Sequence, residues 1–214
     1  MSVVLNQMLT TLQIDSESSI EKFSQSLQKA HPSGIDFLIN NAGIAMSGFN
    51  PDIVKQTLHC NYYGTLNVCR TLLPHIRDGG RLVNVASMAG HLSSKYSSDI
   101  KNRFLSASKV EDITSIMKAF ETAVEKDEHK NDFPSAAYAV SKAGVIGMTN
   151  VLAKEVGERV QINSCCPGYV QTDMTKGGGH KSVDEGAMTP VMLAIGGIGG
   201  VRGGFWQHEK QIQW

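Results

Sequence analysis

The sequence predicts an α/β protein built on a parallel sheet with helices on both faces. Residues 35–39 form a short, nearly continuous apolar run, as in a strand that is covered on both faces. Residues 81–87 and 160–166 are two further strands, and segments with apolar residues at helical spacing separate the three. Strands that alternate with helices indicate a parallel sheet between helical layers. A chain of 214 residues is long enough to bury a core, and we expect one domain over residues 1–214.

The helices of the first third are marked by their start signals. Residues 1–14 fit either a strand or a helix. Ser18 and Glu21 have the spacing of a capping box and predict the start of an amphipathic helix. Asn50 is followed by a proline, which is favoured in the first turn of a helix, and a long helix is expected to begin there. One face of this long helix carries Val54, Leu58, Asn61, Thr65, Val68 and Leu72.

Residues 88–137 form a long, mostly polar excursion between two of the predicted elements. Within it, Ser108 and Glu111 predict a second capping box. The helix that follows is amphipathic, because apolar residues recur on one of its faces. These residues are Ile113, Met117, Phe120 and Val124.

The last third continues the alternation of helix and strand. A helix is predicted over residues 138–157, and Ser182 with Glu185 caps another that contains a proline. The glycine-rich residues 195–204 must form a loop, and residues 204–206 open a final strand.

Composition and charge exclude several classes of protein. Lys plus Arg and Asp plus Glu number 20 each, and this balance gives no sign of a nucleic-acid or membrane partner. No apolar run reaches transmembrane length, and the N-terminus lacks the pattern of a signal peptide. The four cysteines have neither disulfide-framework nor zinc-site spacing, which favours reduced thiols in a cytoplasmic protein and no metal site. They are Cys60, Cys69, Cys165 and Cys166.

Tyr138 and Lys142 are the candidate catalytic pair. On a helix, residues four apart lie on the same face. An ammonium beside a phenol favours the phenolate, which predicts a lowered pKa for Tyr138 and a phenol able to exchange a proton near neutral pH. A surface helix can carry such a pair by chance. A catalytic role for the pair therefore needs support from other residues of the sequence.

Three other residues lie where predicted strands end. Asn40, Ser87 and Pro167 each lie at or directly after the end of a strand. In a parallel sheet, ligands bind beyond the carboxyl ends of the strands. We therefore expect these residues to converge on one crevice.

The order and spacing of these residues resemble the short-chain dehydrogenase/reductase family over about residues 12–214. The chain is more narrowly similar to the carbonyl reductases of that family, which share the insertion 88–137, a stretch like residues 163–170 and a tail like residues 209–214. The resemblance implies a Rossmann-like, doubly wound parallel sheet. The matching motifs are Asn40-Asn41-Ala42-Gly43, Asn61, Ser87, Tyr138 with Lys142, and Pro167-Gly168.

The resemblance also implies a role for each of these residues. Tyr138 would protonate the carbonyl oxygen, and Lys142 would lower its pKa and hold the nicotinamide ribose. Ser87 would donate a hydrogen bond to the same oxygen, and Asn61 would hold a water behind Lys142. The cofactor would be NADPH. Its adenosine side would meet Asn40, Ala42 and Gly43, and its carboxamide would meet the loop of Pro167, Gly168, Val170 and Thr172.

One part of the family pattern is not recognisable in this sequence. Members open with a strand, a glycine-rich turn of the form T-G-x-x-x-G-x-G and a helix, and the turn holds pyrophosphate at the helix N-terminus. The resemblance is therefore to an N-terminally truncated carbonyl reductase without its first βαβ unit. The expected function is monomeric, NADPH-dependent reduction of a ketone, aldehyde or quinone. The alternative is a catalytically impaired remnant with a binding or regulatory role.

Overall fold

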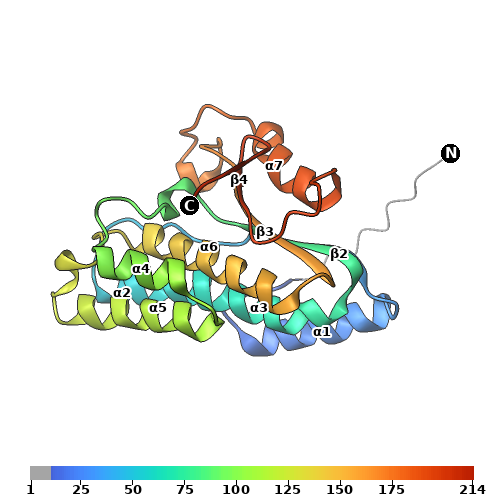
Figure 1. Ribbon diagram of the computed structural model, residues 1–214, viewed down its shortest axis with the longest axis horizontal. Helices are drawn as coiled ribbons and strands as arrows, with labels where there is room; N and C mark the ends of the chain where they lie inside the picture. Colours follow the sequence, from blue (N-terminus) through green and yellow to red (C-terminus); the bar gives the residue numbers. More distant parts are fainter. Residues whose placement is uncertain (1–10) are drawn as a thin grey trace.

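The computed structural model describes residues 11–214 and shows an α/β fold built on one five-stranded sheet (Figure 1). The strands follow one another across the sheet in chain order, and the first three pairings are parallel. The last two strands form an antiparallel hairpin. The strands are β1 (Ile35–Asn40), β2 (Ile76–Val85), β3 (Val160–Cys166), β4 (Phe205–Gln207) and β5 (Lys210–Ile212).

The predicted parallel sheet is confirmed, with differences at its margins. β3 has the predicted bounds, whereas β2 begins five residues before the predicted start and ends at Val85, before Ser87. β5 was not predicted, because its three residues lack an apolar run. The expectation for the first ten residues of the chain lies outside the described residues.

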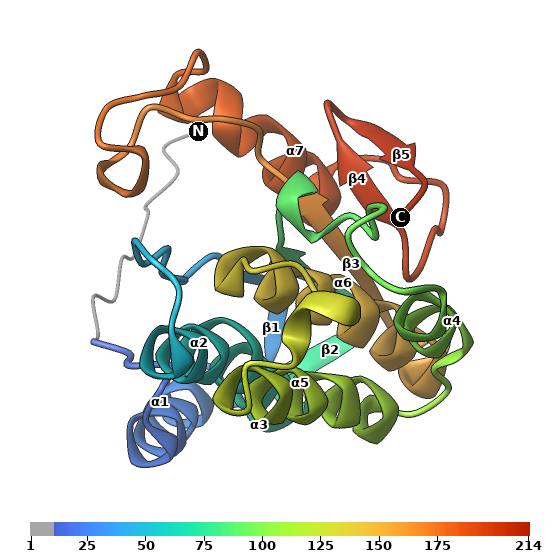
Figure 2. The same ribbon diagram turned by 90° about the vertical axis from the view of Figure 1, so that its left-hand side faces the viewer.

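Helices cover the two faces of the sheet unequally (Figures 1 and 2). One face carries α1 (Glu17–Ala30), α2 (Pro51–Leu58), α3 (Thr65–Leu72), α4 (Ser98–Ser106), α5 (Val110–Glu125) and α6 (Ala137–Val156). The other face is covered by α7 (Val183–Ile195), which packs on β2 and β3 through Leu193 and Ala194. Within residues 11–214, no helix has both the length and the apolar character needed to cross a membrane.

The predicted long helix after Asn50 is interrupted by a π-helical turn. α2 and α3 are joined by a π-helix over His59–Gly64, which contains Asn61. Gly64 lies against the backbone of the chain before α1, because a Cβ added to it would come 2.6 Å from the Ile14 carbonyl oxygen. π-turns inside α-helices occur frequently at functional sites. This one turns the Asn61 side chain into the protein interior, where 1% of the residue is exposed.

Two of the three predicted capping boxes are wrong by one or two residues. Ser16, and not Ser18, caps α1 by accepting from the Ser19 N–H. At α5 the carboxylate of Asp112 accepts from the backbone N–H groups of Ser108 and Lys109 at 2.9 and 3.0 Å, in place of Glu111. In both cases several polar residues lie near the helix start, and their spacing alone did not distinguish which of them caps the helix. The box predicted for Ser182 and Glu185 at α7 is confirmed.

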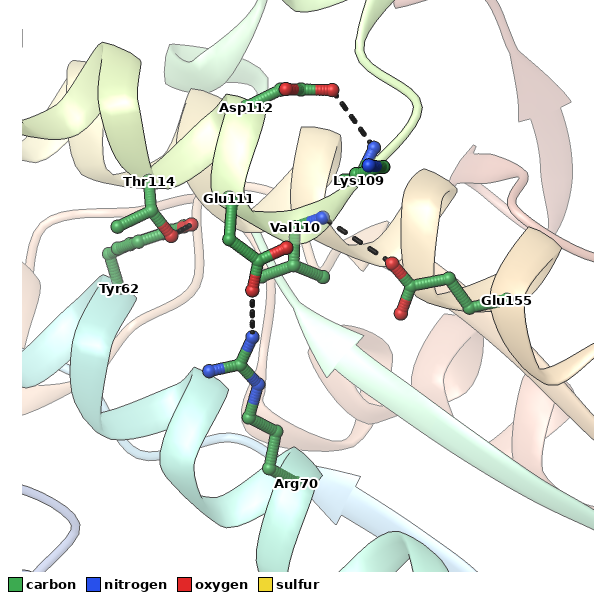
Figure 3. A network of polar contacts seen from close by, with 8 residues as sticks. All are labelled: Tyr62, Arg70, Lys109, Val110, Glu111, Asp112, Thr114 and Glu155. Atoms are coloured by element: carbon green, nitrogen blue, oxygen red, sulfur yellow. Dashed lines mark hydrogen bonds and ion pairs between the residues drawn. The ribbon is translucent and has the colours of Figure 1, made fainter.

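The insertion 88–137 is folded onto the helical layer. The predicted apolar stripe of α5 is buried, and α4, which was not predicted, packs beside it through Ile100 and Phe104. Polar contacts hold the start of α5 in place (Figure 3). Arg70 on α3 pairs with Glu111 at 2.7 Å, and the Tyr62 and Thr114 hydroxyls are 2.8 Å apart. The insertion therefore covers the surface formed by α2, α3 and α6.

β1 lies at the edge of the described sheet. Within residues 11–214 it pairs with β2 alone. Ile35 and Leu38 pack under α1, but Phe37 is 46% exposed and Ile39 is 38% exposed. An edge strand with apolar side chains in solvent is a site of association with other chains.

Candidate active site

A cavity of about 910 Å³ lies at the carboxyl ends of β1, β2 and β3. The loops that follow these strands, the start of α6 and one side of α7 form its walls. All of the predicted site residues except Asn40 and Asn61 line it. Those that do are Ala42, Gly43, Ser87, Tyr138, Lys142, Pro167, Gly168, Val170 and Thr172. The expected convergence on one crevice is thus confirmed for Ser87 and Pro167, and it is wrong for Asn40, which does not line the cavity.

Ser87 is positioned by the tight turn that follows β2. Its Oγ accepts from the Ala89 N–H at 3.1 Å and caps a short 3₁₀ helix, Met88–Gly90. Gly90 lies directly on the backbone of α6, because a Cβ added there would come 2.6 Å from the Lys142 carbonyl carbon. This close approach fixes the turn against α6 and brings Ser87 to the same cavity wall as Tyr138 and Lys142.

Lys142 is a buried lysine whose ammonium is turned towards the sheet. The residue is 4% exposed, and Nζ donates to the Val85 carbonyl oxygen at 2.9 Å. Nζ lies 5.6 Å from the centroid of the Tyr138 ring. Burial disfavours the charged form and lowers the pKa of Lys142 to about 8. The side chain is therefore still largely protonated at neutral pH.

The lowered pKa predicted for Tyr138 is not what the structure shows. Burial raises the pKa of Tyr138 above its usual value, and the nearby Ser87 hydroxyl opposes that rise. The sequence argument failed because spacing placed the ammonium beside the phenol but could not show how deeply the phenol is buried. It also could not show that Val85 takes the hydrogen bond of Lys142. The phenol is consequently protonated at neutral pH.

Asn61 supports the site from behind the cavity wall. Its Oδ1 accepts from the Ile44 N–H at 2.8 Å, and its Nδ2 donates to the Ile44 carbonyl oxygen at 2.9 Å. Nδ2 also donates to Ser141 Oγ at 3.0 Å, and Ser141 in turn donates to the Tyr138 carbonyl oxygen. The amide thus joins the turn after β1 to the first turn of α6.

Asn40 also lies beneath the cavity and does not line it. Its Nδ2 donates to Asn84 Oδ1 at 2.8 Å and to Cys69 Sγ at 3.3 Å. Asn84 Nδ2 donates onward to Thr149 Oγ1 at 2.9 Å. This chain of hydrogen bonds, partly buried at Asn40 and fully buried at Asn84, ties the end of β1 to β2 and α6.

Sequence reasoning missed the part of the cavity wall that α7 contributes. The strand-end rule locates loops, and it does not show where the helix after a loop returns across the sheet. The capping box at Ser182 located α7, but only the structure shows that its side faces the cavity. The additional lining residues include Asn41, Met174, Lys176, Val183, Pro190 and Val191.

The residues present fit the nicotinamide end of a dinucleotide cofactor. Ser87, Tyr138 and Lys142 line this space. Gly43 lets the turn after β1 pack closely on the catalytic side chains, because a Cβ added there would come 3.2 Å from Asn61 Oδ1 and 3.5 Å from Lys142 Nζ. The Pro167–Gly168 turn faces the same space. Across residues 11–214, no group of three or more His, Cys, Asp or Glu side chains is placed to hold a metal ion.

Comparison with known proteins identifies the family. The sequence profile described as "short chain dehydrogenase" matches residues 5–126 and 128–182. Carbonyl reductase (NADPH) 3 of Rattus norvegicus is 39% identical over 196 residues, covering 86% of this chain and 70% of the relative. Carbonyl reductase (NADPH) 1 of Homo sapiens is 36% identical over 217 residues, covering 95% and 78%.

Solved structures show the same fold. Salutaridine reductase from Papaver somniferum superposes with a TM-score of 0.84 at 24% identity, covering 91% of this chain and 80% of that one. NADPH-bound carbonyl reductase from chicken fatty liver gives a TM-score of 0.67 at 20% identity, covering 95% and 75%. With the profile match over most of its length, the chain belongs to the short-chain dehydrogenase family of oxidoreductases.

Proposed function

We propose that this chain is an NADPH-dependent carbonyl reductase that reduces ketone, aldehyde or quinone carbonyls. The observation that carries the proposal is that Ser87, Tyr138 and Lys142 share one wall of a cavity at the strand ends. The names of the relatives, which are carbonyl reductases using NADPH, support the choice of reaction and of cofactor.

The protonation states derived above suit carbonyl reduction. NADPH supplies a hydride when it is bound. Tyr138, kept protonated by burial, donates its proton to the carbonyl oxygen. Ser87 Oγ accepts from the Ala89 N–H, which leaves its own proton free to donate to the same oxygen. The Lys142 ammonium donates one N–H to the Val85 carbonyl oxygen. Its other two N–H groups can donate to the phenolate and to a ribose hydroxyl.

The cofactor contacts we propose lie on two sides of the cavity. Ala42 and Gly43 form the side towards adenosine, with Asn40 holding that turn from below. Pro167, Gly168, Val170 and Thr172 form the side towards the carboxamide. The sequence has no T-G-x-x-x-G-x-G turn, and residues 1–214 alone therefore hold NADPH mainly through its nicotinamide end.

We also propose that the protein acts as a cytoplasmic monomer of one domain. The support for the monomer is the packing of α5 over α2 and α6, which removes that helical surface from contact with another subunit. Four free thiols, three of them buried, suit a reducing compartment.

The test is NADPH oxidation at millimolar cofactor with one aldehyde, one ketone and one quinone. Tyr138→Phe keeps the ring and removes the proton, and we expect a loss of roughly 10²–10⁴ in rate. The control is Tyr63→Phe, because that hydroxyl bonds Glu121 outside the cavity and should leave the rate unchanged. A Tyr138→Phe rate equal to that of the parent would refute the assigned mechanism. If the parent protein reduced none of the three carbonyl compounds, the result would favour the alternative, a catalytically impaired remnant with a binding or regulatory role.

A further inference from the structure

A second cavity of about 320 Å³ opens beside the catalytic one. It shares Ser87, Gly168 and Tyr169 with the catalytic cavity, and we call it the side cavity. A space of this size is at the lower end of the range for small-ligand sites and suits a compound with a single ring. Because Ser87 lines both cavities, a substrate carbonyl held at Ser87 has room to place its remaining atoms in the side cavity.

The polar side chains of the side cavity are cationic or can donate hydrogen bonds. Beyond the shared residues, it is lined by His180, Lys181, Gln207 and His208 together with less polar groups. In the described part of the chain, neither cavity has an Asp or Glu in its lining. The chain as a whole has as many Asp and Glu as Lys and Arg residues, and the absence of acidic side chains from the two cavity linings is therefore a local feature.

Lys181 is held in a defined position at this cavity. Its backbone N–H donates to the Tyr169 carbonyl oxygen at 3.2 Å, and its carbonyl oxygen accepts from the Gln171 N–H at 2.9 Å. Its Nζ donates to the Pro167 carbonyl oxygen at 3.4 Å. The stem crosses Gly168, where an added Cβ would come 2.9 Å from Lys181 Cδ. The ammonium is thus fixed over the turn that separates the two cavities, with two protons unused.

The acidic residues close to this wall already have partners. Glu185 accepts from the Ser182 N–H at 2.7 Å in the capping box of α7. Glu209 accepts from Thr189 Oγ1 at 2.7 Å. Neither carboxylate lines the side cavity, and neither makes an ion pair with Lys181. A carboxylate brought by a ligand would therefore meet a cation that has no acidic side chain bonded to it.

We propose that the side cavity selects carbonyl substrates that carry a carboxylate, which Lys181 binds while the carbonyl lies at Ser87 and Tyr138. The proposal rests on the proposed function for the position of the carbonyl. A charge-assisted hydrogen bond contributes about 1.5–3 kcal/mol, which corresponds to a preference of about tenfold or more.

The experiment compares 4-formylbenzoate with its methyl ester, a pair that differs in this charge. Lys181→Gln should lower the acid-to-ester ratio of kcat/KM about tenfold, and Lys181→Arg should retain most of it. The matched control is Lys154→Gln, an exposed lysine in the last turn of α6, which should leave the ratio unchanged. In the parent, 0.5 M NaCl should reduce the acid's advantage, and this measurement needs no variant.

A binding measurement separates this proposal from the proposed function. Calorimetry with 4-(hydroxymethyl)benzoate and its methyl ester, without cofactor, reports the preference even if neither aldehyde is reduced. Tighter binding of the acid that weakens in Lys181→Gln supports the role of Lys181. Equal binding of acid and ester, or a preference that Lys181→Gln leaves intact, would overturn it.

Discussion

Replacing Lys142 with Met should change how stability depends on pH. Lys142 is 4% exposed, and its burial lowers its pKa from 10.5 to about 8. Between these two pH values the unfolded chain binds a proton that the folded chain does not. Stability therefore rises with pH across this window, and below pH 8 the folded protein bears the full cost of burying the charge.

The size of the effect follows from the shift. At about 1.4 kcal/mol per pKa unit, the shift corresponds to a cost of about 3 kcal/mol below pH 8. About 1 kcal/mol of that cost is removed between pH 7 and pH 9. The difference in unfolding free energy, wild type minus Lys142→Met, should therefore increase by about 1 kcal/mol from pH 7 to pH 9.

Urea unfolding at pH 7, 8 and 9 measures this difference. Burial also raises the pKa of Cys69 and Cys165 to about 12, but those groups titrate in both proteins and cancel in the comparison. Lys154→Met, at an exposed position of the same helix, is the control and should show no such trend. A difference that stays constant, or that decreases with pH, would refute the assignment of Lys142 as a buried ammonium.

Three further predictions concern packing and assembly. Sedimentation should show a monomer, since α5 covers the helical surface of α2 and α6, and a stable tetramer would contradict this. Phe120→Ala should lower the unfolding free energy by about 3–5 kcal/mol, because the ring is fully buried. Phe37 is 46% exposed, and Phe37→Ala should therefore lower the unfolding free energy far less. Equal losses in the two variants would be inconsistent with this packing. Any association at high concentration should involve β1, and Phe37→Lys should reduce light scattering, which an unchanged signal would disprove.

The sequence determined most of the architecture through apolar pattern and strand-end geometry. The run at residues 160–166 predicted β3 with its observed bounds, and the rule for parallel sheets placed Ser87 and Pro167 on one cavity. The spacing of Tyr138 and Lys142 predicted a shared helix face, and both residues line that cavity. These features depend on local order, which a sequence records directly.

The features that the sequence did not predict depend on contacts between distant segments. The π-turn around Asn61 is accompanied by the contact of Gly64 with Ile14 and by the hydrogen bonds of Asn61 to Ile44. The raised pKa of Tyr138 depends on burial, which spacing cannot report. Asn40 matched a family motif, yet its side-chain amide donates to Asn84 Oδ1 and does not line the cavity. In each case the deciding partner is remote in sequence.

The most direct test of the account compares the binding of NADPH and of reduced nicotinamide mononucleotide to residues 1–214 by calorimetry. The cavity has residues for the nicotinamide end, and the sequence has no glycine-rich turn for the pyrophosphate. We predict weak binding of both ligands with similar affinity, because the sequence offers no glycine-rich turn to the pyrophosphate in the additional half of NADPH. Micromolar or tighter binding of NADPH, with the mononucleotide much weaker, would contradict the account and would show that these residues form a phosphate site of their own.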